Sequence, residues 1–215
     1  MPGGQAVTSS GARHQTAGDR GDEQRGDSEA AALEICLRLL TAAPRTRAQL
    51  DLALRRRGVQ QQAADAALNR LAEAGLIDDA AFARAWVDTR HRGRGLARRA
   101  LTAELRQRGV DEGDVRAAIA GLGPEQEAAA ARRLVEAKLA ATRGRPLATR
   151  MRRLTGLLAR KGYPAGMAYR VIREALEQEG IDPARAGLET EGALDAGLAT
   201  GEPDLDGELG LDPGD

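Results

Sequence analysis

A repeated helical segment is the sequence feature that most limits how this chain can fold. Its three copies are LDLALRRRGV (50–59), LTAELRQRGV (101–110) and LTGLLARKGY (154–163). In each copy two leucines stand four residues apart and a glycine follows four residues after the second. Leucines at this spacing share one helix face, and a glycine in that place predicts a left-handed helix C-cap. The three glycines are Gly58, Gly109 and Gly162.

The same pattern of apolar residues predicts an all-helical fold. Apolar residues recur every three or four positions between Ala30 and Ile181, and Gly or Pro separates the segments. Nine helices are expected, at about 30–43, 46–57, 60–74, 79–91, 96–108, 111–121, 124–143, 146–161 and 165–179. The predicted fold class is all-α, with three tandem three-helix modules in an elongated arrangement and with disordered termini.

Composition sets the expected module boundaries. The two ends are rich in Gly and polar or acidic residues and lack periodic apolar positions, so neither end can offset the entropy of an ordered chain. The expected organisation is a disordered head (1–29), three modules (30–76, 77–122 and 123–181) and an acidic disordered tail (182–215).

The residue counts exclude several classes of protein. Aromatic residues make up only 2% of the chain, so its core must consist of Leu, Ala, Val and Ile. The single cysteine, Cys36, excludes an intramolecular disulfide and a Cys-rich zinc site, and it suits a reducing cytosol. No segment has the apolar run of a signal peptide or of a membrane helix, so a cytoplasmic protein is expected.

A net charge of zero hides a strong segregation of charge. Residues 30–181 contain 28 Lys and Arg against 17 Asp and Glu, a balance of +11. Residues 182–215 contain ten acidic residues and one arginine, a balance of −9, and the first 29 residues add −2. This segregation predicts a polyanionic partner, with a tail that competes for it or simply keeps the chain soluble.

The sequence offers little for catalysis. The adjacent carboxylates Asp78 and Asp79 could bind a metal, but His91 is the only further ligand type nearby. Both aspartates fit a helix N-cap and first turn better, where they accept hydrogen bonds from free backbone amides. No Ser–His–Asp set, phosphate-binding loop or metal-ligand spacing is present, so the chain is expected to be neither an enzyme nor a cofactor-binding protein.

Two aromatic residues and a set of arginines remain as candidates. Phe82 and Trp86 stand four residues apart on one helix face and are expected to anchor the middle module to its core. A loop from Arg90 to Gly95 is expected to present guanidinium groups and backbone amides to phosphates or carboxylates. The predicted contact residues for a polyanionic partner such as DNA are Arg90, Arg92, Arg94, Arg98, Arg99, Arg106, Arg152, Arg153 and Arg160.

The segment GLIDDAAFARAWVDTR (75–90), followed by ELRQRGV (104–110) and LLARKGY (157–163), resembles the RecX family, bacterial regulators of the RecA recombinase. The resemblance covers about Ala30 to Gln178. It implies a curved molecule that binds in the groove of the RecA nucleoprotein filament. It further implies blocked filament growth or promoted disassembly, with less strand exchange, ATP hydrolysis and co-protease activity. The expected partners of such a monomer are the RecA filament and single-stranded DNA, with double-stranded DNA as a further one.

Two other functions fit the same sequence. A three-helix module can place a helix in the major groove of DNA, and Gln60, Gln61 and Gln62 are the nearest to base-reading side chains. Strongly salt-dependent binding to naked DNA would favour that function. A helical-repeat scaffold for another protein would instead bind through an apolar patch and would be insensitive to salt.

Overall fold

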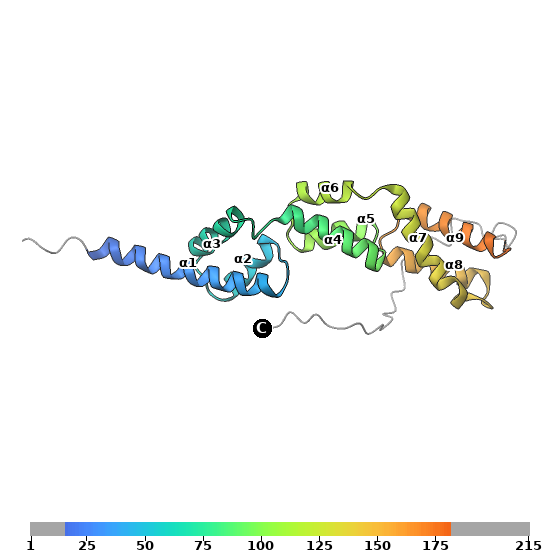
Figure 1. Ribbon diagram of the computed structural model, residues 1–215. Coiled ribbons are helices and arrows are strands. Elements are labelled where there is room, and N and C mark those ends of the chain that lie inside the picture. The colour runs from blue at the N-terminus through green and yellow to red at the C-terminus, as the bar shows by residue number, and fades with distance from the viewer. Residues whose placement is uncertain (1–15, 182–215) are drawn as a thin grey trace, which may run out of the picture. The chain divides into compact units, whose positions relative to one another are not determined.

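A computed structural model describes residues 16–181 of the chain (Figure 1). Part of the predicted disordered head (1–15) and the entire acidic tail (182–215) lie outside the described residues. All regular secondary structure within residues 16–181 is helical, which confirms the all-α fold class. The elements are α1 (Thr16–Ala42), α2 (Arg47–Arg56), α3 (Gln61–Glu73), α4 (Asp79–Arg94), α5 (Arg98–Gln107), α6 (Glu112–Ala120), α7 (Pro124–Leu139), the 3-10 helix η1 (Ala140–Thr142), α8 (Leu147–Arg160) and α9 (Ala165–Gln178).

Two helix ends differ from the expected ones. Helix α1 begins at Thr16, whereas the sequence predicts a start near residue 30, after a disordered head. Once a packed helix exists, extending it costs far less than nucleating it, and apolar periodicity does not report such an extension. Helix α4 continues to Arg94, so most of the predicted loop from Arg90 to Gly95 is its last turn. Gly95 ends it, with a φ of +62° and an N–H that donates to the carbonyl of His91 at 2.9 Å.

The described residues form two compact units, called unit 1 and unit 2 below. Unit 1 comprises the chain up to Trp86 together with Glu104–Ala118, and unit 2 comprises Val87–Ala103 together with the chain from Ile119 onward. The helices around the second copy of the repeat therefore contribute residues to both units. Each unit is described by itself.

Unit 1 has an aliphatic core. Helix α1 packs against α3 and α2, and α2 packs against α3 (Figure 1). The repeat leucines Leu50 and Leu54 are fully buried there. Cys36 is also buried, and this burial raises the pKa of the Cys36 thiol. The other buried members of this core are Ala32, Ala64, Ala67, Leu68, Leu71 and Ile77.

Unit 2 repeats this arrangement near the C-terminal end of the described chain. Helix α7 packs against α8 and α9, which also pack against each other (Figure 1). The repeat leucines Leu154 and Leu158 are again buried. They lie in a core with Ala97, Ala131, Val135, Leu139, Met151, Tyr163, Ala168, Val171, Ile172, Ala175 and Leu176.

The second copy of the repeat docks on the first through its glycine, within unit 1. Gly109 has a φ of +74°, and a Cβ added to it would lie 2.4 Å from Cβ of Ala48 in α2. The hydroxyl of Thr46, which caps α2, donates to the carbonyl of Arg108 at 2.6 Å. The N–H of Arg47 donates to Oδ1 of Asp79 at 2.9 Å. Polar groups at the start of α2 are therefore hydrogen-bonded to two residues further along the chain, Asp79 and Arg108.

The third copy docks on the second in the same way, within unit 2. Gly162 has a φ of +86°, and an added Cβ would lie 2.6 Å from the backbone nitrogen of Ala100 in α5. The N–H of Ala97, which precedes α5, donates to the carbonyl of Lys161 at 2.9 Å. The N–H of Arg98 donates to Oε1 of Glu127 at 3.0 Å. Gly109 and Gly162 thus each end their own helix and also let that helix touch the start of the preceding repeat helix.

The third repeat helix, α8, starts differently from the other two. Thr46 and Ala97 stand four residues before the first leucine of their copies, and Arg150 holds that place in the third. Helix α8 begins earlier, after Pro146, so Arg150 lies inside it and is 4% exposed. Its side chain donates to the hydroxyl of Thr142 at 3.0 Å and forms an ion pair with Glu179. At the start of α2 and of α5, this position contacts the next copy of the repeat. In α8 the ion pair between Arg150 and Glu179 occupies it instead.

The ion pair around Arg150 should make the stability of the protein depend on pH. Hydrogen bonds from Arg150 and then Arg143 hold the pKa of Glu179 below its ordinary value of 4.5. A carboxylate with a lowered pKa stabilises the fold above its unfolded pKa, and that contribution disappears as the pH falls through the folded pKa. We expect Glu179→Gln to lower Tm at pH 7. The difference in Tm between this variant and the unmodified protein should become smaller below about pH 4.5. Thermal melts from pH 7 to pH 3 measure this, and a constant difference would contradict it.

No helix among the described residues combines the length and the apolar composition that crossing a membrane requires.

Candidate polyanion-binding surface

The nine predicted contact arginines come from three places. Arg90, Arg92 and Arg94 lie in the last turns of α4, Arg98, Arg99 and Arg106 in α5, and Arg152, Arg153 and Arg160 in α8. The structure gives them different surroundings, because some bind carboxylates of the same chain while others extend into solvent.

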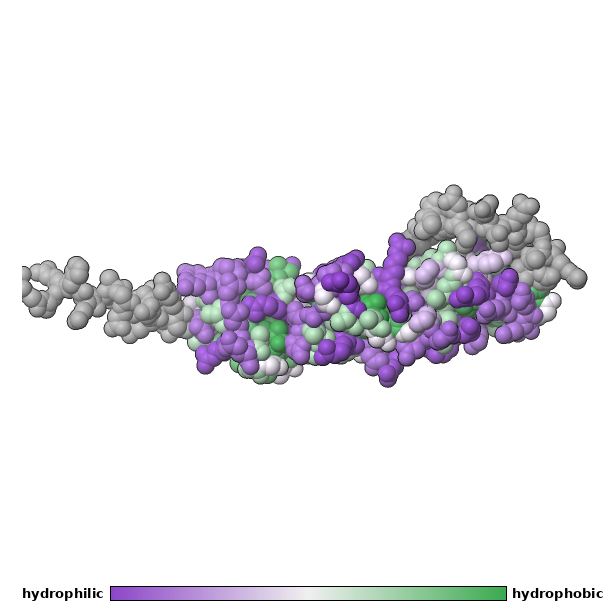
Figure 2. Space-filling view, turned by 90° about the horizontal axis from the view of Figure 1, so that it is seen from above, coloured by the Kyte–Doolittle hydropathy of each residue, from purple (hydrophilic) through white to green (hydrophobic). Residues whose placement is uncertain are grey.

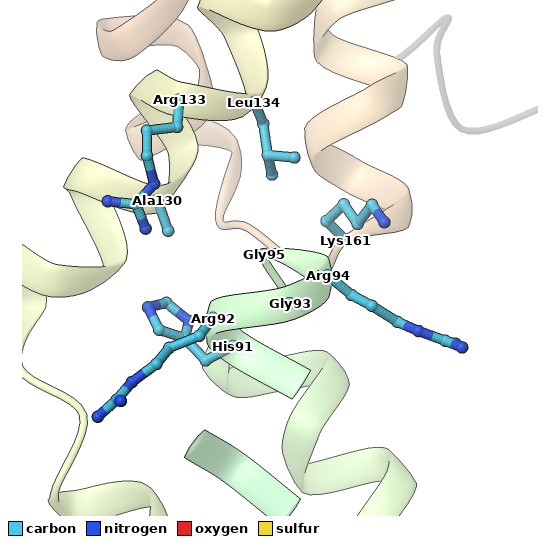
Figure 3. A pocket seen from close by; sticks show the side chains of 9 residues that line it. All are labelled: His91, Arg92, Gly93, Arg94, Gly95, Ala130, Arg133, Leu134 and Lys161. Carbon is cyan, nitrogen blue, oxygen red and sulfur yellow. The ribbon is translucent and has the colours of Figure 1, made fainter. Parts of the chain in front are cut away.

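Two of the three α4 arginines, Arg92 and Arg94, border a pocket within unit 2 (Figure 3). The pocket has a volume of about 490 Å³ and is lined by His91, Arg92, Gly93, Arg94, Gly95, Ala130, Arg133, Leu134 and Lys161. Arg92 and Arg94 extend in opposite directions from the helix end, so they do not converge on one point (Figure 3). Arg92 also pairs with Asp88 one turn earlier, at 2.7 Å.

Two side-chain hydrogen bonds hold the turn that ends α4 beside this pocket. His91 is buried, and its Nδ1 lies 2.9 Å from the carbonyl oxygen of Leu96. A carbonyl only accepts, so Nδ1 carries the hydrogen and His91 serves the turn that ends α4. The hydroxyl of Tyr163 donates to the carbonyl of Gly95 at 3.0 Å, and burial raises the pKa of Tyr163 to about 12. This hydroxyl therefore stays protonated as a donor at neutral pH.

Helix ends account for much of the positive charge around the pocket. Helix α4 ends there, and Lys161 is the C-cap residue of α8. A helix C-terminus carries partial negative charge and is stabilised by nearby cations. Arg94 and Lys161 have this role without any ligand, so the pocket is a weaker candidate for anion binding than an exposed helix face.

Two of the three α5 arginines are bound within the chain. Arg98 pairs with Glu127 and donates to the carbonyl of Leu122, so it joins α5 to α7 and does not stand on an open stripe. Arg106 forms a two-point interaction with Glu112, at 2.7 and 2.9 Å, which lowers the pKa of that carboxyl. Only Arg99 of this group is exposed without a hydrogen bond or ion pair to another described residue.

The α8 arginines form the most open group. Arg152, Arg153 and Arg160 are all exposed, and α8 contains no acidic residue. No carboxylate among the described residues lies within ion-pair distance of these three side chains. This face is therefore available to an external anion.

The aromatic pair does not lie in the core, contrary to the prediction. Phe82 and Trp86 are both half-buried, and their rings stack with centroids 5.6 Å apart. The indole N–H of Trp86 donates to Oε2 of Glu104 at 2.7 Å, and the guanidinium of Arg108 lies 3.7 Å from the centre of its ring. The α4–α5 contact is thus a surface cluster of rings and charges, while the buried hydrophobic residues of both helices are aliphatic.

Removal of this indole should have a moderate effect. We expect Trp86→Ala to lower the free energy of unfolding by about 1–2 kcal/mol, because a half-buried ring, one hydrogen bond and one cation–π contact are lost. Trp86→Phe should retain about half of that stability, since a smaller aromatic ring remains while the N–H and the second ring are lost. Urea unfolding measures both, and a loss from Trp86→Ala as large as that of a buried core residue would contradict the surface position.

The two aspartates at the start of α4 have separate partners. Oδ1 of Asp78 accepts the N–H of Ala81 at 2.7 Å, the geometry of an N-cap. Asp79 instead accepts the N–H of Arg47 at the start of α2, and partial burial is the main reason that its pKa is raised. No group of three or more His, Cys, Asp or Glu residues that could hold a metal occurs in the part of the chain that the structure describes.

The sequence prediction missed three basic residues. Arg133 and Lys161 line the pocket, and Arg150 forms the buried ion pair. Lys161 could have been found, because it directly precedes the repeat glycine, as Arg108 does in the second copy. Arg150 could also have been found, because it stands four residues before Leu154 on the same helix face, whereas no periodic signal distinguishes Arg133 from Arg132 beside it.

These features define a class of protein built from tandem three-helix domains whose repeat helices dock through glycines. Models of the RecX three-helix domains match this chain: the first domain at residues 32–71, the second at 78–119 and the third at 125–172. The chain belongs to the RecX family. These matches confirm three three-helix domains, while the boundaries at 30–76, 77–122 and 123–181 stay a prediction.

Related sequences and structures agree with this assignment. The chain is 64% identical over 156 residues to "Regulatory protein RecX" of Thermobifida fusca, covering 73% of this chain and 84% of that protein. It is 52% identical over 179 residues to the protein of the same name in Streptomyces coelicolor, covering 83% and 95%. A crystal structure of RecX from Lactobacillus salivarius shares the fold, with a TM-score of 0.64 at 18% identity over 69% of this chain and 97% of that one.

Proposed function

We propose that this protein is a negative regulator of the RecA recombinase. It binds the RecA nucleoprotein filament and blocks filament extension or promotes disassembly, which lowers recombinase, ATPase and co-protease activity. The observation that carries the proposal is that all three domains match the RecX family, whose curated members are named regulatory proteins. The exposed arginines of α8 support it, because a nucleoprotein filament contains a polyanion.

The proposal makes the protein a non-enzymatic cytoplasmic monomer without a cofactor. Its partners are the RecA filament, single-stranded DNA and, as a further partner, double-stranded DNA. The acidic tail is assigned no role here.

ATP hydrolysis by RecA filaments on single-stranded DNA tests this function. The full-length protein is added well below the RecA concentration, and hydrolysis is followed over time. Strong inhibition at this ratio is expected, because one regulator at a filament end or one propagating disruption affects many RecA subunits. Unchanged hydrolysis at equal concentrations would overturn the proposal and favour a direct DNA-binding protein or a scaffold.

A single charge reversal adds a test of the surface. Arg99→Glu is expected to weaken inhibition, because this arginine is exposed and its side chain makes no internal bond. Reversal of Arg98 is unsuitable, since it would also break the contacts with Glu127 and Leu122. Inhibition that is unchanged by Arg99→Glu, with an unchanged Tm, would remove Arg99 from the proposed contact surface.

A further inference from the structure

Within residues 30–181, almost all of the net positive charge lies in the unit 2 segments 87–103 and 119–181. Within residues 30–181, the unit 2 segments 87–103 and 119–181 contain 17 Lys and Arg and seven Asp and Glu, a balance of +10. The unit 1 segments 30–86 and 104–118 contain 11 basic and ten acidic residues, a balance of +1. A polyanion is therefore attracted to unit 2 far more strongly than to unit 1.

Exposed apolar residues have the opposite distribution. The large hydrophobic side chains with substantial exposure among the described residues are Leu37, Leu52 and Leu76, and all three belong to unit 1. On the face shown in Figure 2, hydrophilic residues cover most of the described surface and apolar patches are small. Protein interfaces are depleted of charge at their centres, whereas nucleic-acid interfaces are polar and strongly positive. The surface of unit 2 therefore fits a nucleic acid better than a protein.

Most acidic residues of the unit 2 segments 87–103 and 119–181 form ion pairs with arginines outside the exposed α8 group. Glu127 pairs with Arg98, Glu174 with Arg132, Glu177 with Arg173, and Glu179 with both Arg143 and Arg150. None of these carboxylates reaches the exposed arginines of α8. The charge of that face is thus uncompensated within the described chain.

The three exposed arginines of α8 lie around a glycine on one helix face. Gly156 stands between Arg152, Arg153 and Arg160, at three or four residues from each, so all four positions are neighbours on the helix surface. An added Cβ at Gly156 would meet only Nη1 of Arg160, at 3.5 Å. Arg153 and Arg160 are seven residues apart, or about 10 Å along the helix axis. The guanidinium of Arg160 lies close to Gly156, where no side chain intervenes, and guanidinium groups pair well with phosphates.

We propose that the chain contacts nucleic-acid phosphates through unit 2, with Arg152, Arg153 and Arg160 of α8 surrounding Gly156 as the central contact, and that unit 1 contributes little to this binding. The inference rests on the proposed function for the identity of the polyanion. It assigns the electrostatic contact to one part of the chain, which neither the repeat nor the net charge does. The contact is to the backbone and does not depend on base sequence.

Binding to labelled oligo(dT) without RecA tests the assignment, so its outcome is separate from that of the ATPase assay. The full-length protein is titrated by fluorescence anisotropy over a range of salt concentrations. Arg153→Gln/Arg160→Gln should raise Kd at least about tenfold at low salt and reduce the slope of log K against log salt by about 1.4, for two lost phosphate contacts. Equal melting temperatures of the variants would show that they are folded.

The matched control is Arg56→Gln/Arg84→Gln, which removes two exposed arginines from unit 1 and changes the net charge equally. We expect this pair to change Kd by less than about twofold and to leave the salt slope nearly unchanged. Equal losses from the two pairs would overturn the assignment to unit 2. Failure of the unmodified protein to bind oligo(dT) at low salt would also overturn it, whatever its effect on RecA.

Discussion

Gly162→Ala is expected to lower the free energy of unfolding by about 3 kcal/mol, whereas Gly58→Ala should cost about 1 kcal/mol. Both glycines have positive φ, +86° and +73°, so both substitutions carry the strain of a left-handed alanine. Only at Gly162 would the new methyl group also meet the backbone of Ala100, at 2.6 Å. Nothing lies within 4 Å of the corresponding position at Gly58, because no repeat precedes the first one.

Urea unfolding of the two variants measures this difference directly. Gly109→Ala should resemble Gly162→Ala, since its methyl group would lie 2.4 Å from Cβ of Ala48. Equal effects at Gly58, Gly109 and Gly162 would mean that backbone strain alone matters and that the close contacts between copies relax without cost.

Thr46→Ala is expected to lower the free energy of unfolding by about 2–3 kcal/mol. The hydroxyl of Thr46 accepts the N–H of Gln49 at 3.2 Å and donates to the carbonyl of Arg108 at 2.6 Å. Alanine removes a helix cap and also leaves the Arg108 carbonyl without this donor. The hydroxyl belongs to Thr46, which has no exposed surface. The two losses add because they concern different partner groups.

Conservative variants separate these two contributions. Thr46→Ser keeps the hydroxyl and should recover most of the stability, while Thr46→Val keeps the shape and should be about as unstable as Thr46→Ala. Thermal and urea unfolding both measure the series. A stable Thr46→Val variant would show that packing, and not the two hydrogen bonds, holds this position.

The repeat made much of the fold predictable. Leucine spacing located the helix faces, and Gly58, Gly109 and Gly162 all have the left-handed φ that their place after a helix suggests. The contacts of Gly109 and Gly162 with a neighbouring copy could not be predicted, because a single sequence reports local conformation but not which helix end approaches it. The same limit explains Phe82 and Trp86. Their spacing placed them on one face, but it could not say that this face meets charged residues at the surface.

The candidate surface was less predictable than the fold. Helix geometry predicted shared faces for the arginines, but an ion pair depends on a partner that is distant in sequence. Arg98 and Glu127 are separated by 29 residues, and Arg150 and Glu179 are also separated by 29. The spacing of Arg150 from Leu154 indicates the buried face of the helix, but no local pattern identifies Glu179 as its partner or Glu127 as that of Arg98.

The start of α8 has a consequence for how many domains such a chain can contain. In the first two copies a group at the start of the repeat helix donates a hydrogen bond to the following copy. A further domain after α9 would need such a donor at the start of α8. Pro146 has no N–H, and the side chain of Arg150 already occupies the equivalent position. A duplicated copy of the middle domain could be inserted between the second and third domains. Its own glycine would contact the start of α5, and Gly162 of the third domain would contact the start of its repeat helix. Domain gain by internal duplication is therefore compatible with this architecture, whereas gain by addition after α9 would require the Arg150–Glu179 pair to be replaced first.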